Sequence, residues 1–378
     1  SHGCAFINFK RMNICIVVGA RPNFIKVAPI IRAIDKANAE GKEISHTLVY
    51  AGSETDPTLE PSLFEDLQMQ RPDVFLGVDC VNLNELTGQV MSAFERYLQQ
   101  HHTDAVIVVD DLASTMAAAI VTKKQGITLA HLVAGTRSFD ISMPKEINRL
   151  VIDGLSDLLF TAGLGGNSAA AREGAESSKV YMVGNILMDT LRFNHQRFRR
   201  PQLLDELGIA DGGYIVLTLN RKALLADRDE MRALLTAMAG HSHGIPVIAP
   251  LRRQASEVVS AVVAEHPELF PMLHITEPLG YLEFGYLSAH ALGVVTDSGN
   301  VAEEATFNHV PCITLNSYTE HIETVKTGSN VLVGENPELL SAEMERMVRK
   351  EWKPCGVPER WDGRSAERIV SILQEYNA

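Results

Sequence analysis

The stretch from Val294 to Ala305 joins an apolar run to a small polar turn and two adjacent carboxylates. The run ends in Asp297-Ser298-Gly299, and Glu303 and Glu304 follow early in a predicted helix. The first N–H groups of a helix have no acceptor within the helix, so they bind anions well. A nearby carboxylate can hold a sugar hydroxyl, as acids do in dinucleotide-binding folds. The stretch therefore predicts a seat for a nucleotide diphosphate, and an ordinary joint capped by Ser298 is the alternative.

Two cations follow the first predicted strand, Ile14–Gly19. Arg21 precedes Pro22, which suits the start of a helix, and Lys26 lies in the next turn. Both side chains are expected at the carboxyl edge of that strand, where they can bind a ligand phosphate. A solvated helix start explains the same residues equally well.

Further polar residues follow two later strands. Asp110 and Asp111 come directly after Ala105–Val109, where carboxylates can act as base, metal ligand or helix cap, and capping is the favoured interpretation of Asp111. The segments Gly135–Asp140 and Met143–Arg149 bring together residues of both charges, as a pocket for a charged, hydroxyl-rich ligand requires. A salt-bridged surface between domains is the alternative.

Three other segments are interpreted as structural. The glycine-rich run Thr161–Asn167 lacks the spacing of a phosphate-binding fingerprint, so we predict a mobile turn. His241-Ser242-His243 predicts a surface loop, although two histidines can bind an adventitious metal ion. The aromatic residues of Pro278–Phe284, including Tyr281, can frame a flat base, but a role in the core is favoured.

Short apolar runs alternate with helical segments along the whole chain. Runs rich in Val, Ile and Leu indicate strands buried on both faces, and their alternation with helices predicts parallel sheets. The predicted strands are 14–19, 46–50, 105–109, 129–133, 157–160, 180–183, 214–219, 246–249, 273–275, 293–296 and 311–315. The predicted helices include 24–37, 86–99, 114–124, 146–156, 228–239, 255–265, 339–349 and 365–376.

The alternation breaks into two series near the basic segment Arg197-Phe198-Arg199-Arg200-Pro201. We therefore predict two Rossmann-like α/β domains facing each other across a cleft. Residues 1–11 are interpreted as an extension, 12–195 as the first domain, 196–364 as the second domain, which carries the predicted nucleotide seat, and 365–378 as a helix that packs back on the first. Ligands of such sheets bind outside the carboxyl ends of the strands.

Composition narrows the classes of function. The chain has 378 residues, of which 46% are hydrophobic and 21% charged, which is ordinary for a globular protein. The net charge of -13 argues against nucleic acid or an anionic membrane as partner. No apolar run approaches the roughly 20 residues of a membrane helix. The five cysteines lack zinc or redox spacing, so we expect a reduced, cytoplasmic protein without metal or cofactor.

Taken together and in order, these motifs resemble the non-hydrolysing UDP-N-acetylglucosamine 2-epimerase family. The resemblance runs from about Met12 to the end of the chain. It rests on 19–26, 134–138, 144–149, 183–185, 278–281, Asp297-Ser298-Gly299 and Glu303-Glu304. It implies two domains of the glycosyltransferase-B type, a homodimer, and inversion of C2 between UDP-GlcNAc and UDP-ManNAc. In that reaction a proton leaves C2, UDP is eliminated, and both add back, so an acid, a base and a held diphosphate are needed.

The reactive positions depart from the family pattern. Valine stands at Val133 where the family has a catalytic glutamate, Lys145 reverses a second catalytic charge, and Asn220 replaces a histidine. Asp111 keeps a family position, whereas Glu146 lies one residue beyond the lost carboxylate. Three further motif loops also differ, at 52–55, 250–254 and 319–323.

The nucleotide seat is kept better than the reactive positions. The resemblance implies that UDP is bound by Arg21, Lys26, Arg149, Tyr281, Ser298, Gly299, Asn300 and Glu304, with Glu304 on the ribose. Asn300 stands where the family has glycine, which can crowd a phosphate slightly.

Three hypotheses follow. The first is a protein that binds UDP or a UDP-N-acetylhexosamine but epimerises it weakly or not at all, and for which an active paralogue is a candidate partner. The second is a working UDP-sugar enzyme that uses Asp111, Lys145 and Glu146. The third is a glycosyltransferase with Asp110 and Asp111 near the donor.

Overall fold

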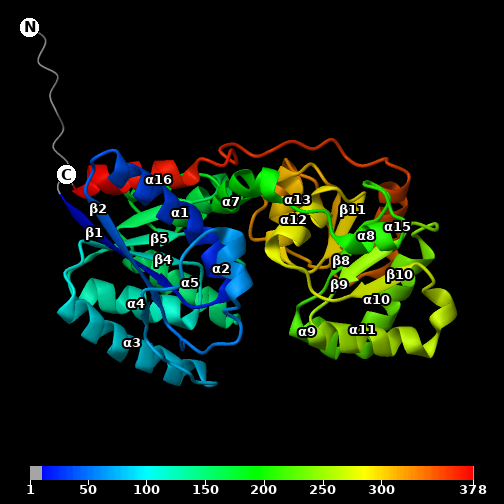
Figure 1. Ribbon diagram of the computed structural model, residues 1–378, viewed down its shortest axis with the longest axis horizontal. Coiled ribbons are helices and arrows are strands. Elements are labelled where there is room, and N and C mark those ends of the chain that lie inside the picture. The colour runs from blue at the N-terminus through cyan, green and yellow to red at the C-terminus, as the bar shows by residue number, and fades with distance from the viewer. Residues whose placement is uncertain (1–10, 378) are drawn as a thin grey trace, which may run out of the picture. The chain divides into compact units, whose positions relative to one another are not determined.

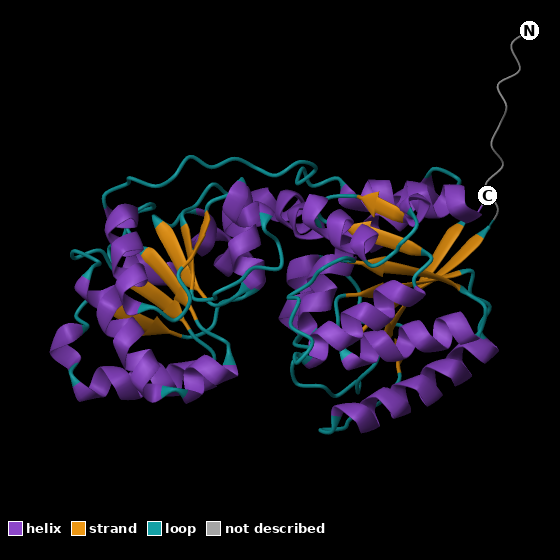
Figure 2. Ribbon diagram, turned by 180° about the vertical axis from the view of Figure 1, so that it is seen from behind, coloured by secondary structure: helices purple, strands orange, loops and turns teal. Residues whose placement is uncertain are grey.

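Two separate parallel sheets are built from the apolar runs that the sequence predicts as strands (Figure 1). The computed structural model describes residues 11–377, so most of the predicted extension lies outside the described residues. One unit contains the chain up to Phe193 and again from Glu359, and the other contains Asn194–Pro358. Figure 2 shows that helices flank each sheet on both faces, which is why the strands are buried and apolar.

The first unit holds a seven-stranded sheet in the order β3-β2-β1-β4-β5-β6-β7 with every pairing parallel. Its strands are β1 Met12–Val18, β2 Ile44–Tyr50, β3 Val74–Phe75, β4 Ala105–Val109, β5 Thr128–Leu132, β6 Leu158–Thr161 and β7 Val180–Met182. Its helices are α1 Arg21–Ala39, α2 Pro61–Leu67, α3 Leu83–Gln100, α4 Ala113–Lys124, α5 Pro144–Leu155, α6 Leu164–Arg172, α7 Ile186–Asn194 and α16 Ser365–Asn377.

The second unit holds a six-stranded parallel sheet in the order β10-β9-β8-β11-β12-β13. Its strands are β8 Ile215–Thr218, β9 Val247–Pro250, β10 Leu273–Thr276, β11 Gly293–Thr296, β12 Cys312–Thr314 and β13 Asn330–Leu332. Its helices are α8 Gln202–Glu206, α9 Lys222–Ala226, α10 Arg228–Gly240, α11 Arg253–Glu265, α12 Tyr281–Ala289, α13 Gly299–Phe307, α14 Glu323–Lys326 and α15 Pro337–Val348.

The strand order reverses once in each sheet, between β1 and β4 in the first and between β8 and β11 in the second. In open parallel sheets such a switch point leaves a crevice outside the carboxyl ends of the strands, where ligands bind. The predicted fold class, two Rossmann-like α/β domains of the glycosyltransferase-B type, is confirmed. Among helices of the described residues, none combines the length and the apolarity needed to span a bilayer.

The chain returns to the first unit at Glu359, six residues before the expected position 365. Trp361 is 2% exposed, and its Nε1 donates to the carbonyl of Ala162 at 3.1 Å. This buried ring fixes the segment before α16 to the first sheet. Helix α16 then packs on α1 (Figure 1). Asp189 of α7 accepts the N–H groups of Ser365 and Ala366 at 3.1 and 2.8 Å, and so caps α16.

The predicted mobile turn at Thr161–Asn167 is wrong, because Leu164 begins helix α6. Gly135 has a φ of +74°, and a Cβ there would lie 2.3 Å from the carbonyl oxygen of Gly166. The glycines therefore allow α6 to approach the loop after β5, and they serve packing between backbone segments.

Candidate functional site

Asp110 lies at the switch point of the first sheet and is held there by α1. Lys26 Nζ contacts its Oδ1 at 2.7 Å, and Asn23 Nδ2 donates to its Oδ2 at 2.9 Å. Asn23 Oδ1 in turn accepts the N–H of Gly19 at 2.9 Å. Lys26 is only 7% exposed, so the interpretation as a solvated helix start is wrong for this residue. The lysine joins α1 to the end of β4 and keeps a positive charge at the carboxyl edge.

Arg21, the other predicted cation, begins α1 and is less enclosed. Its Nη1 lies 3.3 Å from Glu60 Oε2, and its side chain is 22% exposed. An ion pair this exposed is weak, so an anion of higher charge can compete for the guanidinium. Arg21 follows β1 at the carboxyl edge of the sheet, and its contact with a phosphate stays a prediction.

Arg149 lies between the two carboxylates predicted as catalytic. Its Nη2 and Nε contact Asp111 Oδ2 at 2.9 and 3.0 Å, and its Nη1 contacts Glu146 Oε1 at 3.2 Å. Arg149 and Glu146 are each 3% exposed. The favoured interpretation of Asp111 as the cap of α4 is wrong, because Leu112 is the N-cap and the Asp111 carboxylate is drawn to Arg149 instead.

Glu146 is further engaged by the loop that precedes its helix. Its carboxylate accepts the N–H of Ser138 at 3.0 Å and the N–H of Phe139 at 2.5 Å. Burial alone would raise the pKa of Glu146, but these hydrogen bonds and Arg149 outweigh it and lower the pKa. A carboxylate held in its charged form by so many donors is a poor proton acceptor.

Val133 and Lys145, which replace catalytic residues of the family pattern, differ in solvent accessibility. Val133 follows β5, is partly buried, and has a φ of +66°, a left-handed conformation that β-branched residues rarely adopt. Asp110, after the neighbouring strand β4, has a φ of +63°. Such strain is typical of functional sites, and here it persists although Val133 carries no polar group. Lys145 is exposed at the start of α5.

A buried network behind this edge supports the strained backbone, and the sequence did not predict it. His131 contacts Asp153 Oδ1 through Nδ1 at 2.5 Å and the carbonyl of Asp110 through Nε2 at 2.7 Å. Arg137 Nη2 and the N–H of Gly135 contact Asp153 Oδ2 at 2.8 and 3.0 Å. Burial opposes the charge on His131, but Asp153 outweighs it and raises the pKa of His131. Asp153 lies 22 residues from His131 in the sequence, so no local pattern indicated this network.

The switch point of the second sheet is organised by Asp297, at the end of β11. Its Oδ2 accepts the N–H of Asn220 at 2.9 Å and the N–H of Arg221 at 2.8 Å. The turn after β8 is therefore fixed against β11. Asn220, which replaces the histidine of the resemblance, is exposed at this turn.

Ser298 caps α13, because its Oγ accepts the N–H of Val301 at 3.4 Å. A Cβ placed on Gly299 would meet no atom within 4 Å, so space is open at the first turn of the helix. Asn300 is partly buried beside it. This turn combines helix N–H groups, a hydroxyl and free space, which are the properties of a phosphate seat.

The two glutamates of α13 have different surroundings. Glu303 is 5% exposed and lies 3.3 Å from His321 Nε2. Glu304 is partly buried, and burial together with the charge of Glu303 raises its pKa to about 8. Near neutral pH Glu304 can therefore donate as well as accept a hydrogen bond. Tyr281 begins α12, and its ring meets Phe198 edge to face with centroids 6.0 Å apart.

Comparison with known proteins agrees with this arrangement. The family model for UDP-N-acetylglucosamine 2-epimerase matches residues 36–374. The UDP-N-acetylglucosamine 2-epimerase of Methanocaldococcus jannaschii is 34% identical over 383 residues, which cover 96% of this chain and 99% of that protein. The UDP-2,3-diacetamido-2,3-dideoxy-D-glucuronate 2-epimerase of Pseudomonas aeruginosa is 32% identical over 327 residues, with coverages of 85% and 88%.

The fold is also similar to that of a solved structure. The M. jannaschii epimerase in complex with UDP-GlcNAc and UDP superposes with a TM-score of 0.81 at 32% identity, covering 96% of this chain and all of that one.

Proposed function

The chain belongs to the UDP-N-acetylglucosamine 2-epimerase family, and from this premise we propose that it binds a UDP-N-acetylhexosamine but inverts C2 weakly or not at all. Neither a metal nor a cofactor is required by this proposal. The homodimer and the active paralogue stay predictions.

The ion pairs of Arg149 carry the proposal. Inversion at C2 needs one group that accepts a proton on one face of the sugar and another that donates on the opposite face. Asp111 and Glu146 are the carboxylates predicted as catalytic, and both are engaged by the same buried guanidinium. Glu146 also accepts two backbone N–H groups, which lowers its pKa further from the value that a base needs.

The substituted positions support the same conclusion. Val133 offers no proton acceptor, and the exposed turn at Asn220 carries an amide that does not titrate. Removing one acid or base typically costs a factor of about 100 to 10,000 in rate. Losses within one catalytic unit are not additive, but together they leave little activity.

The nucleotide seat supports retained binding. Ser298, Gly299 and Asn300 form an open helix start, and Glu304 follows on the same helix. Arg21 supplies an accessible cation in the first unit. The M. jannaschii relative was crystallised with UDP-GlcNAc and UDP, and we assign the same ligand class to this chain.

A second candidate is a working enzyme on a related UDP-sugar. It is favoured by the exposed Lys145, whose amine can take a catalytic role, and by the P. aeruginosa relative, which is named for a diacetamido glucuronate. A glycosyltransferase is disfavoured, because Asp110 and Asp111 are both held in ion pairs.

Calorimetry with UDP tests the seat. We expect Glu304→Ala to weaken binding by about 1–3 kcal/mol, the range for a lost hydrogen-bond partner in a buried site. Glu304→Gln should weaken it less, because the amide resembles the protonated acid. Glu338→Ala, which removes an exposed glutamate from α15, is the matched control and should bind as the parent does. Equal affinity of the parent and Glu304→Ala would show that the seat lies elsewhere.

A further inference from the structure

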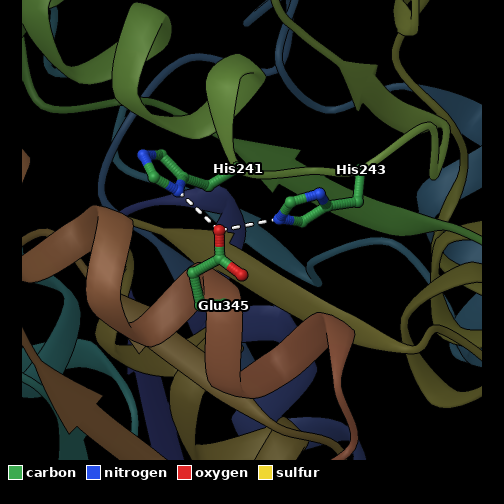
Figure 3. A group of neighbouring side chains, drawn as sticks. All are labelled: His241, His243 and Glu345. Carbon is green, nitrogen blue, oxygen red and sulfur yellow. Dashed lines mark hydrogen bonds and ion pairs between the residues drawn. The ribbon is translucent and has the colours of Figure 1, made fainter.

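Three side chains of the second unit converge at a point away from the nucleotide seat. His241 and His243 lie in the loop between α10 and β9, and Glu345 lies on α15 (Figure 3). His241 Nδ1 and His243 Nε2 contact the same oxygen, Glu345 Oε1, at 2.8 and 2.7 Å. All three ligand atoms lie within 4.8 Å of one another.

The loop conformation presents both histidines on the same side. Ser242 is 3% exposed, and its Oγ donates to the carbonyl of Ala239 at 3.2 Å, so the residue between them points inward. His243 has a φ of +49° and Gly244 a φ of +75°, and the N–H of Ile245 bonds back to Ser242 at 3.0 Å. This tight turn fixes an alternation in which His241 and His243 face α15.

The neighbours of Glu345 on α15 fix its orientation toward the two histidines. Its neighbour Met344 is fully buried in the core of the second unit, which sets the rotation of α15. Arg349, one turn further on, lies 3.4 Å from Oε2 and therefore leaves Oε1 to the histidines.

The chemistry of this set favours one class of ligand. Two imidazole nitrogens and one carboxylate oxygen suit Zn²⁺ and similar transition metals, whereas Mg²⁺ and Ca²⁺ prefer oxygen ligands alone. Zinc bonds of roughly 2.0–2.2 Å place neighbouring ligand atoms a little over 3 Å apart. The present separations from Oε1 are about half an ångström shorter, and the histidine side chains, 38% and 53% exposed, can make that adjustment.

We propose that His241, His243 and Glu345 bind a divalent transition-metal ion, with Zn²⁺ the best match and water completing the coordination. The loop precedes β9, so the site lies at the amino edge of the sheet, opposite the carboxyl edge that carries Ser298. Its role is to tie the loop to α15, and no catalytic step is assigned to it. The spacing of the cysteines, on which the expectation of a metal-free protein rested, has no bearing on this histidine site.

The test uses the full chain, stripped with EDTA and titrated with Zn²⁺ alone against a chromophoric chelator. The parent should bind one equivalent more than the double variant His241→Ala/His243→Ala. Glu345→Gln should lose affinity by more than the roughly 10–100-fold that an outer-sphere partner costs. His266→Ala is the matched control, because His266 pairs with Glu268 at 3.2 Å without a third ligand, and it should bind as the parent does.

Two further readouts keep the test decisive. Co²⁺ in place of Zn²⁺ should give visible d–d absorption in the parent and none in the double variant. Zn²⁺ should raise the Tm of the parent and not that of Glu345→Gln, while circular dichroism in EDTA shows that each variant is folded. The same zinc stoichiometry and the same Tm shift in the parent and both variants would overturn the proposal.

Discussion

Arg149 determines the chemistry available at the first switch point, because one guanidinium serves two carboxylates. Without this cation, Asp111 and Glu146 would repel each other. Arg149 contacts both carboxylates and helps to lower the pKa of Glu146, which makes Glu146 a poor proton acceptor.

Removing the Arg149 guanidinium should destabilise the protein. We expect Arg149→Ala to lower the free energy of unfolding by about 3–5 kcal/mol, because it leaves the buried Glu146 and the partly buried Asp111 without their shared partner. Arg149→Lys should recover part of the loss, since a lysine supplies charge without the fork of donors. Arg253→Ala breaks an exposed pair with Glu257 and serves as control in the same denaturant titration. A change no larger than that of Arg253→Ala would contradict the account.

Restoring carboxylates at positions 133 and 145 should restore proton exchange at C2 of the sugar. Val133→Glu with Lys145→Glu is expected to raise the rate of proton exchange at C2 of UDP-GlcNAc by about 100-fold or more. The backbone at Val133 already has the strained conformation, so the new side chain needs no new loop. Val133→Gln with Lys145→Gln matches size without charge and should stay inactive. Equal exchange by both double variants would show that other groups are responsible for the lost activity.

At the scale of elements, the sequence predicted most of the sheet strands because buried parallel strands appear as continuous Val, Ile and Leu runs. It missed β3, which has only two residues, and β13, and it took the glycines at the start of α6 for a mobile turn. It predicted the strand, the Ser298 cap and the helix at α13, because these signals are local to one segment, and the nucleotide seat there stays a prediction. It could not predict the pairing of Lys26 with Asp110, which joins residues 84 positions apart.

The paired glutamates of α13 make stability depend on pH. Folding raises the pKa of Glu304 from its ordinary 4.5 to about 8, so between these values the folded chain keeps a proton that the unfolded chain releases. Stability must therefore fall as pH rises from about 5 to about 8. Glu304→Gln should lessen that fall, as Tm values at both pH values will show, while Glu338→Gln should not. Parallel Tm curves for the parent and Glu304→Gln would contradict the assignment.

At the scale of the whole molecule, the predicted site residues belong to two units. The proposed diphosphate seat with Glu304 is built on the second sheet, and Val133 and Lys145, where the family resemblance implies acid–base residues, lie on the first. Because each group is fixed by its own switch point, substitutions in the first sheet can abolish proton transfer while the turn at Ser298 stays intact. The fold therefore allows binding and catalysis to be lost separately.

The most direct measurement is NMR of UDP-GlcNAc incubated with the protein in deuterated water, with UDP binding followed by calorimetry on the same sample. We expect a UDP binding signal, with little or no deuterium at C2 and little or no UDP-ManNAc. Rapid deuterium uptake at C2 with formation of UDP-ManNAc would contradict it.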